Sequence, residues 1–159
     1  MLIIRSFCLL IMMVCSFTNV CVAQQDIIKE ADLSAERGNY ECAIILSTKA
    51  AEYYKKKYEE DINYANSLQK LAKYNYAIFN FEEAIRLGTM ASDLKLAILG
   101  ENNQEYVQSI IELAEYNSEY GNDDVALQLG KKVVDLQLAT YGENHPAYAL
   151  SLSNLAEYL

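Results

Sequence analysis

The chain has 159 residues, 52% of them hydrophobic, and a formal net charge of −9 at pH 7. Nucleic acid and anionic membrane surfaces repel an acidic chain, which argues against both as partners and leaves basic or neutral polypeptides open. The single histidine, His145, cannot build a multi-histidine metal site, and the sequence has no phosphate-binding glycine loop or nucleophile elbow. We therefore expect no enzymatic activity, no metal and no cofactor.

The first 23 residues have the layout of a secretory signal peptide. Arg5 supplies a short basic start, an apolar run follows over residues 7–15, and small residues precede Gln24. The apolar run is about half of the roughly 20 residues that a membrane-spanning helix requires. We therefore expect cleavage after Ala23, no membrane span in the mature chain, and export to the periplasm or the medium of a bacterium.

Cleavage after Ala23 would leave Cys42 as the one cysteine of the mature domain, residues 24–159. An exported chain with one cysteine has no internal disulfide framework. Cys42 lies among helix-forming apolar residues, in the segment ECAIIL, so we expect it to pack as a small apolar side chain.

The mature domain repeats itself with a period of 42 residues. An earlier copy aligns at a spacing of 41, with Ala43 matching Ala84. Self-similarity at a fixed period of this size is the signature of stacked helical repeats. The triplets that recur at 42 residues include Tyr64, Tyr106 and Tyr148; Ser67, Ser109 and Ser151; Leu71, Leu113 and Leu155; and Tyr74, Tyr116 and Tyr158.

Each repeat is predicted to be a pair of helices. Val107, Ile110 and Leu113 recur at helical spacing in the first helix of the third unit. Gly121 then ends that helix in a tight turn, whereas Phe79 replaces the glycine in the second unit, where we expect a less sharply defined turn. The predicted units cover about 25–58, 64–99 and 106–141, followed by a lone helix over 146–159.

The second helix of the third unit is predicted to run from Asp123 to Tyr141. Small residues at fixed positions in the second helices, such as Ala84 and Gly88, allow a neighbouring helix to approach closely. The acidic pairs at the starts of these helices favour the helix dipole, which accounts for them without a calcium site. Pro146 falls in the first turn of the lone helix, where proline is tolerated.

The repeat motifs resemble the tetratricopeptide repeat, in the long-period variety found in kinesin light chains. Asn75 and Asn117 depart from it, because the family often has an aromatic residue there, and Glu30 stands where the first unit should have leucine. The resemblance implies an all-α, right-handed superhelical solenoid of about three and a half stacked antiparallel helix pairs. The segments that carry it are GNYECAI (38–44), LAKYNYAIFNFEEAI (71–85), LAEYNSEYGNDDVAL (113–127) and GENHPAYALSLSNLA (142–156).

The same resemblance implies a non-enzymatic scaffold whose first helices line a concave groove that binds a peptide or a helix. The polar residues opposite the packed leucines and alanines are the predicted contacts with a protein or peptide partner. They are Asn66, Gln69, Lys73 and Tyr76 in the second unit, Gln108, Glu112 and Glu115 in the third, and Ser153, Asn154 and Glu157 in the last helix.

Two alternatives remain open at this stage. Similar bacterial repeats are sometimes joined to a caspase-like peptidase, so the chain is alternatively the truncated recognition segment of a longer protein. The last helix carries Leu152, Leu155 and Ala156, which its predecessors bury against a second helix that is missing here. We therefore expect truncation or, alternatively, a homo-oligomer that forms through this helix.

Overall fold

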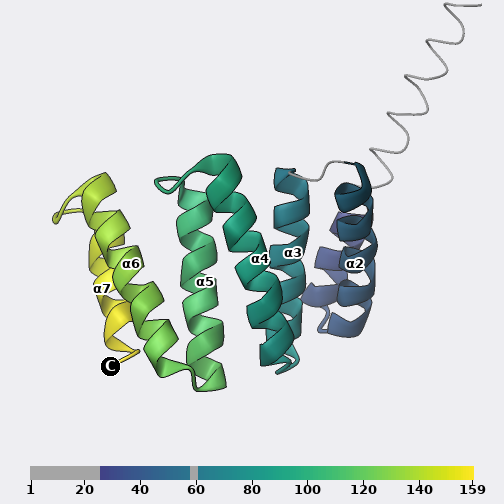
Figure 1. Cartoon of the computed structure of the whole chain (residues 1–159). Helices are drawn as coiled ribbons and strands as arrows, with labels where there is room; N and C mark the ends of the chain where they lie inside the picture. Colours follow the sequence, from purple (N-terminus) through teal and green to yellow (C-terminus); the bar gives the residue numbers. More distant parts are fainter. Residues whose placement is uncertain (1–25, 58–60) are drawn as a thin grey trace, which may run out of the picture.

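The computed structural model describes residues 26–57 and 61–159, so the predicted signal peptide lies outside the described residues. Every regular element within these two ranges is a helix, beginning with one over residues 26–36. The others, shown in Figure 1, are α2 (Tyr40–Lys57), α3 (Ile62–Ala77), α4 (Phe81–Leu99), α5 (Gln104–Tyr120), α6 (Asp123–Tyr141) and α7 (Pro146–Ala156).

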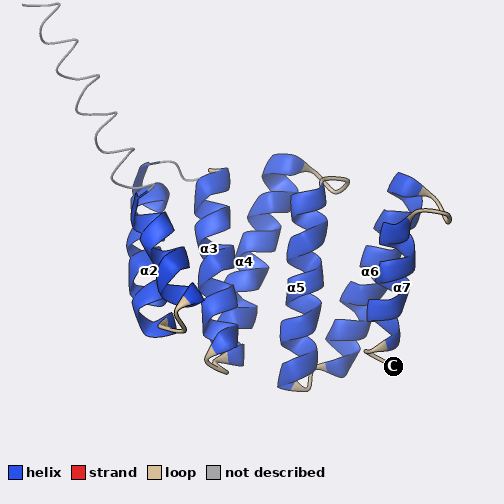
Figure 2. Cartoon of the chain, turned by 180° about the vertical axis from the view of Figure 1, so that it is seen from behind, coloured by secondary structure: helices blue, strands red, loops and turns tan. Residues whose placement is uncertain are grey.

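The helices stack in a single row, and each packs mainly against its neighbours in the sequence. The second helices α4 and α6 lie toward the viewer in Figure 1, and the first helices α3, α5 and α7 come to the front in Figure 2. The first helices therefore share one face of the row, and the second helices share the other.

Small and large buried side chains alternate between the stacked helices. Ala84 and Ala126 are fully buried at equivalent positions of α4 and α6. A side chain at Gly88 would come within 3.3 Å of Leu113, so the glycine allows α4 to lie close against α5. Ile110 of α5 is 2% exposed and packs in one cluster with Val133 of α6. The repeating positions of the sequence are therefore the packing positions of the fold.

Three equivalent residues, Asp61, Asn103 and His145, cap the amino-terminal ends of α3, α5 and α7. Each side chain accepts a hydrogen bond from a backbone N–H that the helix itself leaves unpaired. The caps place the starts of α3 and α5 at Ile62 and Gln104, two residues before the predicted units begin. The donors are the N–H groups of Asn63 at 2.9 Å, Glu105 at 2.8 Å and Ala147 at 3.1 Å.

The turn at Phe79 is as sharply defined as the glycine turns, so the expectation of a looser turn was wrong. Phe79 adopts a left-handed backbone with φ of 62°, as Gly121 does with φ of 88°. The N–H of Asn80 donates to the carbonyl of Asn75 over 2.9 Å, and the bond from Asn122 to Asn117 measures 2.8 Å. These bonds close the same helix-ending motif in both repeats, and they hold Phe79 in a conformation that side chains with a Cβ disfavour.

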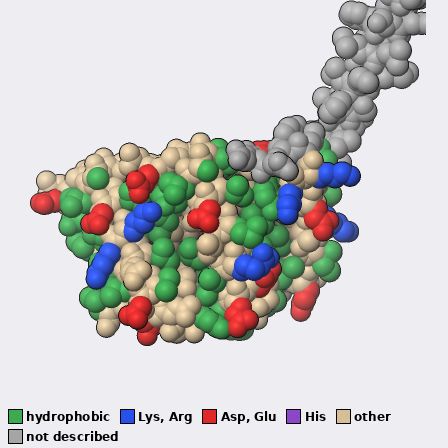
Figure 3. Space-filling view, in the orientation of Figure 1, with side chains coloured by type: hydrophobic (Ala, Val, Ile, Leu, Met, Phe, Trp, Pro, Cys, Tyr) green, Lys and Arg blue, Asp and Glu red, His purple; other side chains and the backbone are tan. Residues whose placement is uncertain are grey.

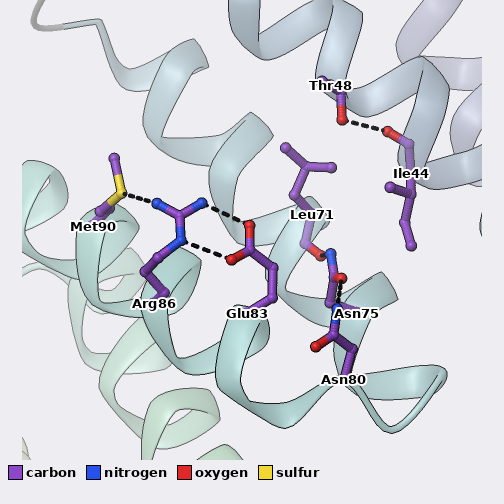
Figure 4. Close-up of polar contacts among 8 residues, drawn as sticks. All are labelled: Ile44, Thr48, Leu71, Asn75, Asn80, Glu83, Arg86 and Met90. Carbon is purple, nitrogen blue, oxygen red and sulfur yellow. Dashed lines mark hydrogen bonds and ion pairs between the residues drawn. The ribbon is translucent and has the colours of Figure 1, made fainter.

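Asn75 and Asn117 each form a hydrogen-bonded pair with a second asparagine at the turn that follows. The amide of buried Asn75 donates to the carbonyl of Leu71 over 2.8 Å and accepts from the Asn80 amide over 2.9 Å (Figure 4). The same two bonds recur at Asn117, over 2.8 and 3.0 Å. Because both amides have partners, these polar residues are accommodated in the interior without an unpaired group.

We expect Phe79→Gly to stabilise the fold by about 1 kcal/mol, because glycine adopts a positive φ without the steric cost of a Cβ. Phe79 is 79% exposed, so little packing is lost with its ring. The measurement is the free energy of unfolding in urea, with Gly121→Ala as the reciprocal control that should destabilise. A less stable Phe79→Gly variant would show that the edge contact of this ring with Phe81, at 6.0 Å, outweighs the backbone strain.

The last helix ends at Ala156, not at Leu159 as expected, and its far side is uncovered among the described residues. Leu155 is half-buried against α6, and it would lie 3.0 Å from a side chain at Gly130. Leu152 is 42% exposed, although its equivalent Ile110 is buried. The helix therefore covers the third unit with one face and leaves the other apolar face bare.

Candidate functional site

The first helices border a cleft of about 840 Å³ that extends from the helix over residues 26–36 across α3 to α5. This cleft and its continuation toward α7 are called the groove below. Five of the ten predicted contact residues line it, and all five project from α3 or α5. They are Asn66, Gln69, Lys73, Tyr76 and Glu112.

Asp32 joins the first two units at one end of the groove. Its carboxylate accepts hydrogen bonds from the amine of Lys70 and, over 2.7 Å, from the hydroxyl of Tyr74. Burial alone would raise the pKa of Asp32, but these two hydrogen bonds outweigh it and hold that pKa below its usual range. The charge of Lys70 is thereby paired with that of Asp32, and Lys73 is an exposed cation on the same helix.

A buried lysine supports the middle of the groove from beneath. Lys95 of α4 is 4% exposed, and its amine donates to the side-chain carbonyl of Gln69. The amide of Gln69 in turn donates to Glu112 over 2.7 Å. Burial lowers the pKa of Lys95, and the carboxylates of Glu105 and Glu112 oppose that shift. The chain of contacts connects α4, α3 and α5 and sets the orientation of Gln69 in the groove.

Two tyrosines lie side by side where α3 faces α5. The ring centres of Tyr76 and Tyr116 are 4.9 Å apart, and the hydroxyl of Tyr76 donates to Glu115 over 3.1 Å. Burial, followed by the negative charge of Glu115, raises the pKa of Tyr76 to about 12. The hydroxyl of Tyr116 is buried and has no hydrogen-bond partner. The charge of Glu115 therefore acts on both rings.

A second cleft, of about 340 Å³, continues the groove between α5 and α7. Three more of the predicted contact residues, Glu115, Asn154 and Glu157, line it. The other two, Gln108 and Ser153, are exposed but line neither cleft, and Gln108 donates to Glu112 over 3.2 Å. The structure thus places eight of the ten predicted residues in the linings of these two clefts.

Charge is segregated along the first helices. α3 contains two lysines and no acidic residue, whereas α5 contains four glutamates and no basic residue. Figure 3 shows the orientation of Figure 1, in which the second helices face the viewer, and there basic and acidic side chains are interspersed. The carboxyl-terminal half of the groove is therefore acidic, and the surface shown in Figure 3 is mixed.

Several groove residues escaped prediction from the sequence. Asp32 and Glu36 come from the first unit, which aligns least clearly, although Asp32 is the repeat equivalent of the predicted Lys73. Glu119 lies one turn beyond the predicted Glu115 on α5, and Tyr158 directly follows the predicted Glu157 after the end of α7. Lys95 lies on the second helix α4, away from the first-helix face that the repeat predicts as the binding surface. An alignment extended to the first unit and to the carboxyl-terminal ends of the first helices would have predicted Asp32, Glu36, Glu119 and Tyr158.

The chemical groups of the groove are suited to hydrogen bonding and charge pairing. Among residues 26–57 and 61–159, no three histidine, cysteine or acidic side chains converge in a way that suits a metal ion.

Cys42 is half-buried on α2, where its sulfur accepts a hydrogen bond from Ser34 over 3.6 Å. None of the helices in these ranges is both long and apolar enough to span a bilayer.

Comparison with known proteins identifies the fold. No protein-family model matches the chain, and no curated protein matches it in sequence. Three solved structures of other repeat proteins match closely in shape. The first is the crystal structure of the nearly identical TPR-like repeats of a kinesin light chain candidate from Podosopora anserina, with a TM-score of 0.74 and 22% sequence identity over 84% of this chain and 64% of that one. The second is a single-residue variant of the same protein, with a TM-score of 0.75 and the same identity and coverage. The third is BtubC (BKLC) from P. vanneervenii, with a TM-score of 0.77 and 15% identity over 85% of this chain and 54% of that one.

The chain spans 64% of the first two structures and 54% of the third. At these identities the likeness concerns the arrangement of helices, and it agrees with the helix pairs and their stacking. The chain therefore has the fold of a tetratricopeptide-type repeat protein, an all-α right-handed solenoid of stacked antiparallel helix pairs.

Proposed function

We propose that this chain is a non-enzymatic scaffold that binds an extended polypeptide segment along its groove. The observation that carries the proposal is the cleft of about 840 Å³, which polar side chains from three successive first helices line. A segment lying across three helices meets several hydrogen-bonding groups in sequence, and that arrangement suits a peptide better than a compact small molecule. The tetratricopeptide-type fold is consistent with such a role.

The proposed location is outside the cytoplasm. It rests on the signal-like layout of the first 23 residues, with Arg5 before an apolar run and small residues before Gln24. Amino-terminal sequencing of the protein recovered from a bacterial periplasm should begin at Gln24. Recovery of the protein with Met1 in place would contradict the proposal.

Selection from a displayed library of random peptides of about twelve residues, enough to extend over roughly 40 Å, tests binding in the groove. We expect selected peptides to bind wild-type protein and to lose about tenfold or more in affinity for Asn66→Trp. The indole would occupy the cleft without changing its charge, since Asn66 is half-buried in the lining. The affinities are to be measured by fluorescence polarisation.

The matched control is Asp93→Trp, which places the same indole on an exposed position of α4 that lines neither cleft. This variant should bind the selected peptides as wild type does. If no peptide can be selected, or if Asn66→Trp binds the selected peptides unchanged, the groove is not the binding site.

A second candidate role is assembly through α7. Leu150 and Leu152 are 63% and 42% exposed on this helix, so its uncovered face is apolar and suited to a second protein surface. Light scattering should then show a concentration-dependent dimer that Leu152→Glu abolishes. A monomer at high protein concentration would dismiss this role and leave the groove proposal intact.

A further inference from the structure

The carboxylates in the acidic half of the groove lack cationic partners within the described part of the protein. Glu112, Glu115, Glu119 and Glu157 take part in no ion pair with any described residue. Each ion pair that does occur involves other carboxylates, such as Asp32 with Lys70 in the first half of the groove. α5 and α7 contain no lysine or arginine at all, so no rotation of a side chain on these helices would supply a cation.

Two buried oxygen atoms in the same unit also lack partners. They are the hydroxyl oxygen of Tyr116, whose residue is 2% exposed, and Oε1 of Gln137, whose residue is 3% exposed. Both atoms can accept a hydrogen bond, and burial without one is unfavourable. Unsatisfied buried polar atoms are rare in folded proteins, so each one requires an explanation.

The repeat alignment explains why these two atoms lack partners. Their equivalents 42 residues earlier are Tyr74 and Lys95, and both bond to residues of the groove lining. Tyr74 bonds to Asp32 over 2.7 Å, and Lys95 bonds to Gln69. For Tyr116 and Gln137 the corresponding positions hold Lys73 and Ile111, and neither equivalent bond forms. The two oxygen atoms therefore lack partners because these residues differ between the repeats. Tyr116 lies beside Tyr76 where α3 faces α5, and neither Tyr116 nor Gln137 lines the cleft between α5 and α7.

Burial and the nearby carboxylates both raise the pKa values of two tyrosines in this part of the protein. Burial and then the charges of Glu112 and Glu115 raise the pKa of Tyr116, and burial and then Glu115 and Glu157 raise that of Tyr158. The unpaired carboxylates of this cleft have one requirement in common, a positively charged group that carries several N–H bonds. Arginine and lysine side chains are the groups in proteins that meet it.

We propose that the acidic half of the groove, between α5 and α7, receives an arginine or lysine side chain of the bound polypeptide, so that the partner of this protein is a basic segment. This inference rests on the proposed function, because it names the chemistry of the peptide that the groove would hold. The cleft of about 340 Å³ lined by Glu115, Glu119 and Glu157 is the place where the basic side chain enters.

The test uses a fluorescein-labelled peptide with arginines in a glycine, serine and asparagine background, and two matched peptides with glutamine or glutamate at the arginine positions. We expect the arginine peptide to bind at least tenfold more tightly than the glutamine peptide, and the glutamate peptide not to bind. Binding of the arginine peptide should weaken as NaCl rises from about 50 mM to about 300 mM, because the charges are solvent-accessible.

The decisive variant is Glu115→Gln with Glu119→Gln and Glu157→Gln, which should reduce affinity for the arginine peptide by about tenfold. Its control carries Asp93→Asn, Asp135→Asn and Glu143→Gln, three exposed residues that line neither cleft, and it changes the net charge equally. The control should bind as wild type does. Equal losses in both variants would show general attraction to an acidic protein and would overturn the inference.

The two proposals fail in distinguishable ways. If selected peptides bind in a manner that Asn66→Trp blocks, but prefer glutamine or glutamate to arginine, the groove binds peptides and the inference about basic segments is wrong. If the arginine peptide binds and Asn66→Trp has no effect while the triple glutamine variant does, the acidic cleft binds cations by itself and the proposed binding along the cleft of about 840 Å³ is wrong. If nothing binds to wild type, both proposals are wrong.

Discussion

Replacing Ile110 by alanine is expected to destabilise the protein by about 2 to 5 kcal/mol. The side chain is 2% exposed and packs among Tyr106, Val133 and Leu136 at the interface of α5 and α6. Truncation removes buried apolar surface and leaves a cavity that the surrounding helices fill only in part, so both terms lower the free energy of unfolding. A domain of this size is stable by about 5 to 15 kcal/mol, so the variant should unfold at a clearly lower urea concentration.

The control for this experiment is provided by the repeat itself. Leu152 occupies the equivalent position on α7, but it is 42% exposed because no described helix covers it. Leu152→Ala is therefore expected to cost less than about 1 kcal/mol in dilute protein. Equal losses at the two positions would mean that the face of α7 is covered in solution. Repeating the measurement at several protein concentrations would then show whether a second copy covers it.

Removing the hydroxyl group from two equivalent tyrosines, Tyr74 and Tyr116, should have opposite effects on the free energy of unfolding. Tyr74→Phe should destabilise by about 1 to 2 kcal/mol, because it deletes the hydrogen bond to the charged carboxylate of Asp32. Tyr116→Phe should stabilise by about 1 kcal/mol, because it deletes a buried hydroxyl without a partner. Urea unfolding of both variants measures the difference. A loss of stability in Tyr116→Phe would reveal that this hydroxyl is engaged in the folded protein.

The same tyrosines predict a loss of stability in alkali. Burial raises the pKa of Tyr116 and Tyr74 in the folded state, and burial with Glu115 raises that of Tyr76 to about 12. The unfolded chain, with tyrosine pKa values near 10, releases these protons first, so its relative free energy falls as pH rises above about 10. Stability is therefore fully present below about pH 10 and is lost as the pH approaches the folded-state values.

Lys95 changes the pH dependence of stability in the opposite direction to the tyrosines. Its pKa is lowered in the folded state, so the unfolded chain binds the extra proton and stability rises with pH as that proton is lost. Comparing wild type with Tyr116→Phe removes this contribution, since both proteins contain Lys95. The urea midpoint of Tyr116→Phe should fall less steeply above about pH 10 than that of wild type. Parallel curves for the two proteins would contradict the raised pKa of Tyr116.

About half of the candidate site could be predicted from the repeat, because helical periodicity determines which side chains share one face of a helix. Asn66, Gln69 and Lys73 lie on the polar side of a helix whose apolar side is marked by leucine and alanine at helical spacing, so their common surface follows from the period of the helix. Lys95 could not be read in this way, because it lies among the residues of a second helix. Only the packing of α4 beneath α3 brings its amine to Gln69.

The sequence by itself determined the fold class, the period and the positions of the helix pairs. Helical periodicity and turn residues such as Gly121 act within a few residues of the chain, so they can be recognised without a partner element. The tertiary structure decided which polar groups meet across helices and which are left without a partner. Tyr74 and Tyr116 occupy the same repeat position, yet one faces the carboxylate of Asp32 and the other has no acceptor. That difference depends on residues about 42 positions away, which only the stacking of the solenoid brings together.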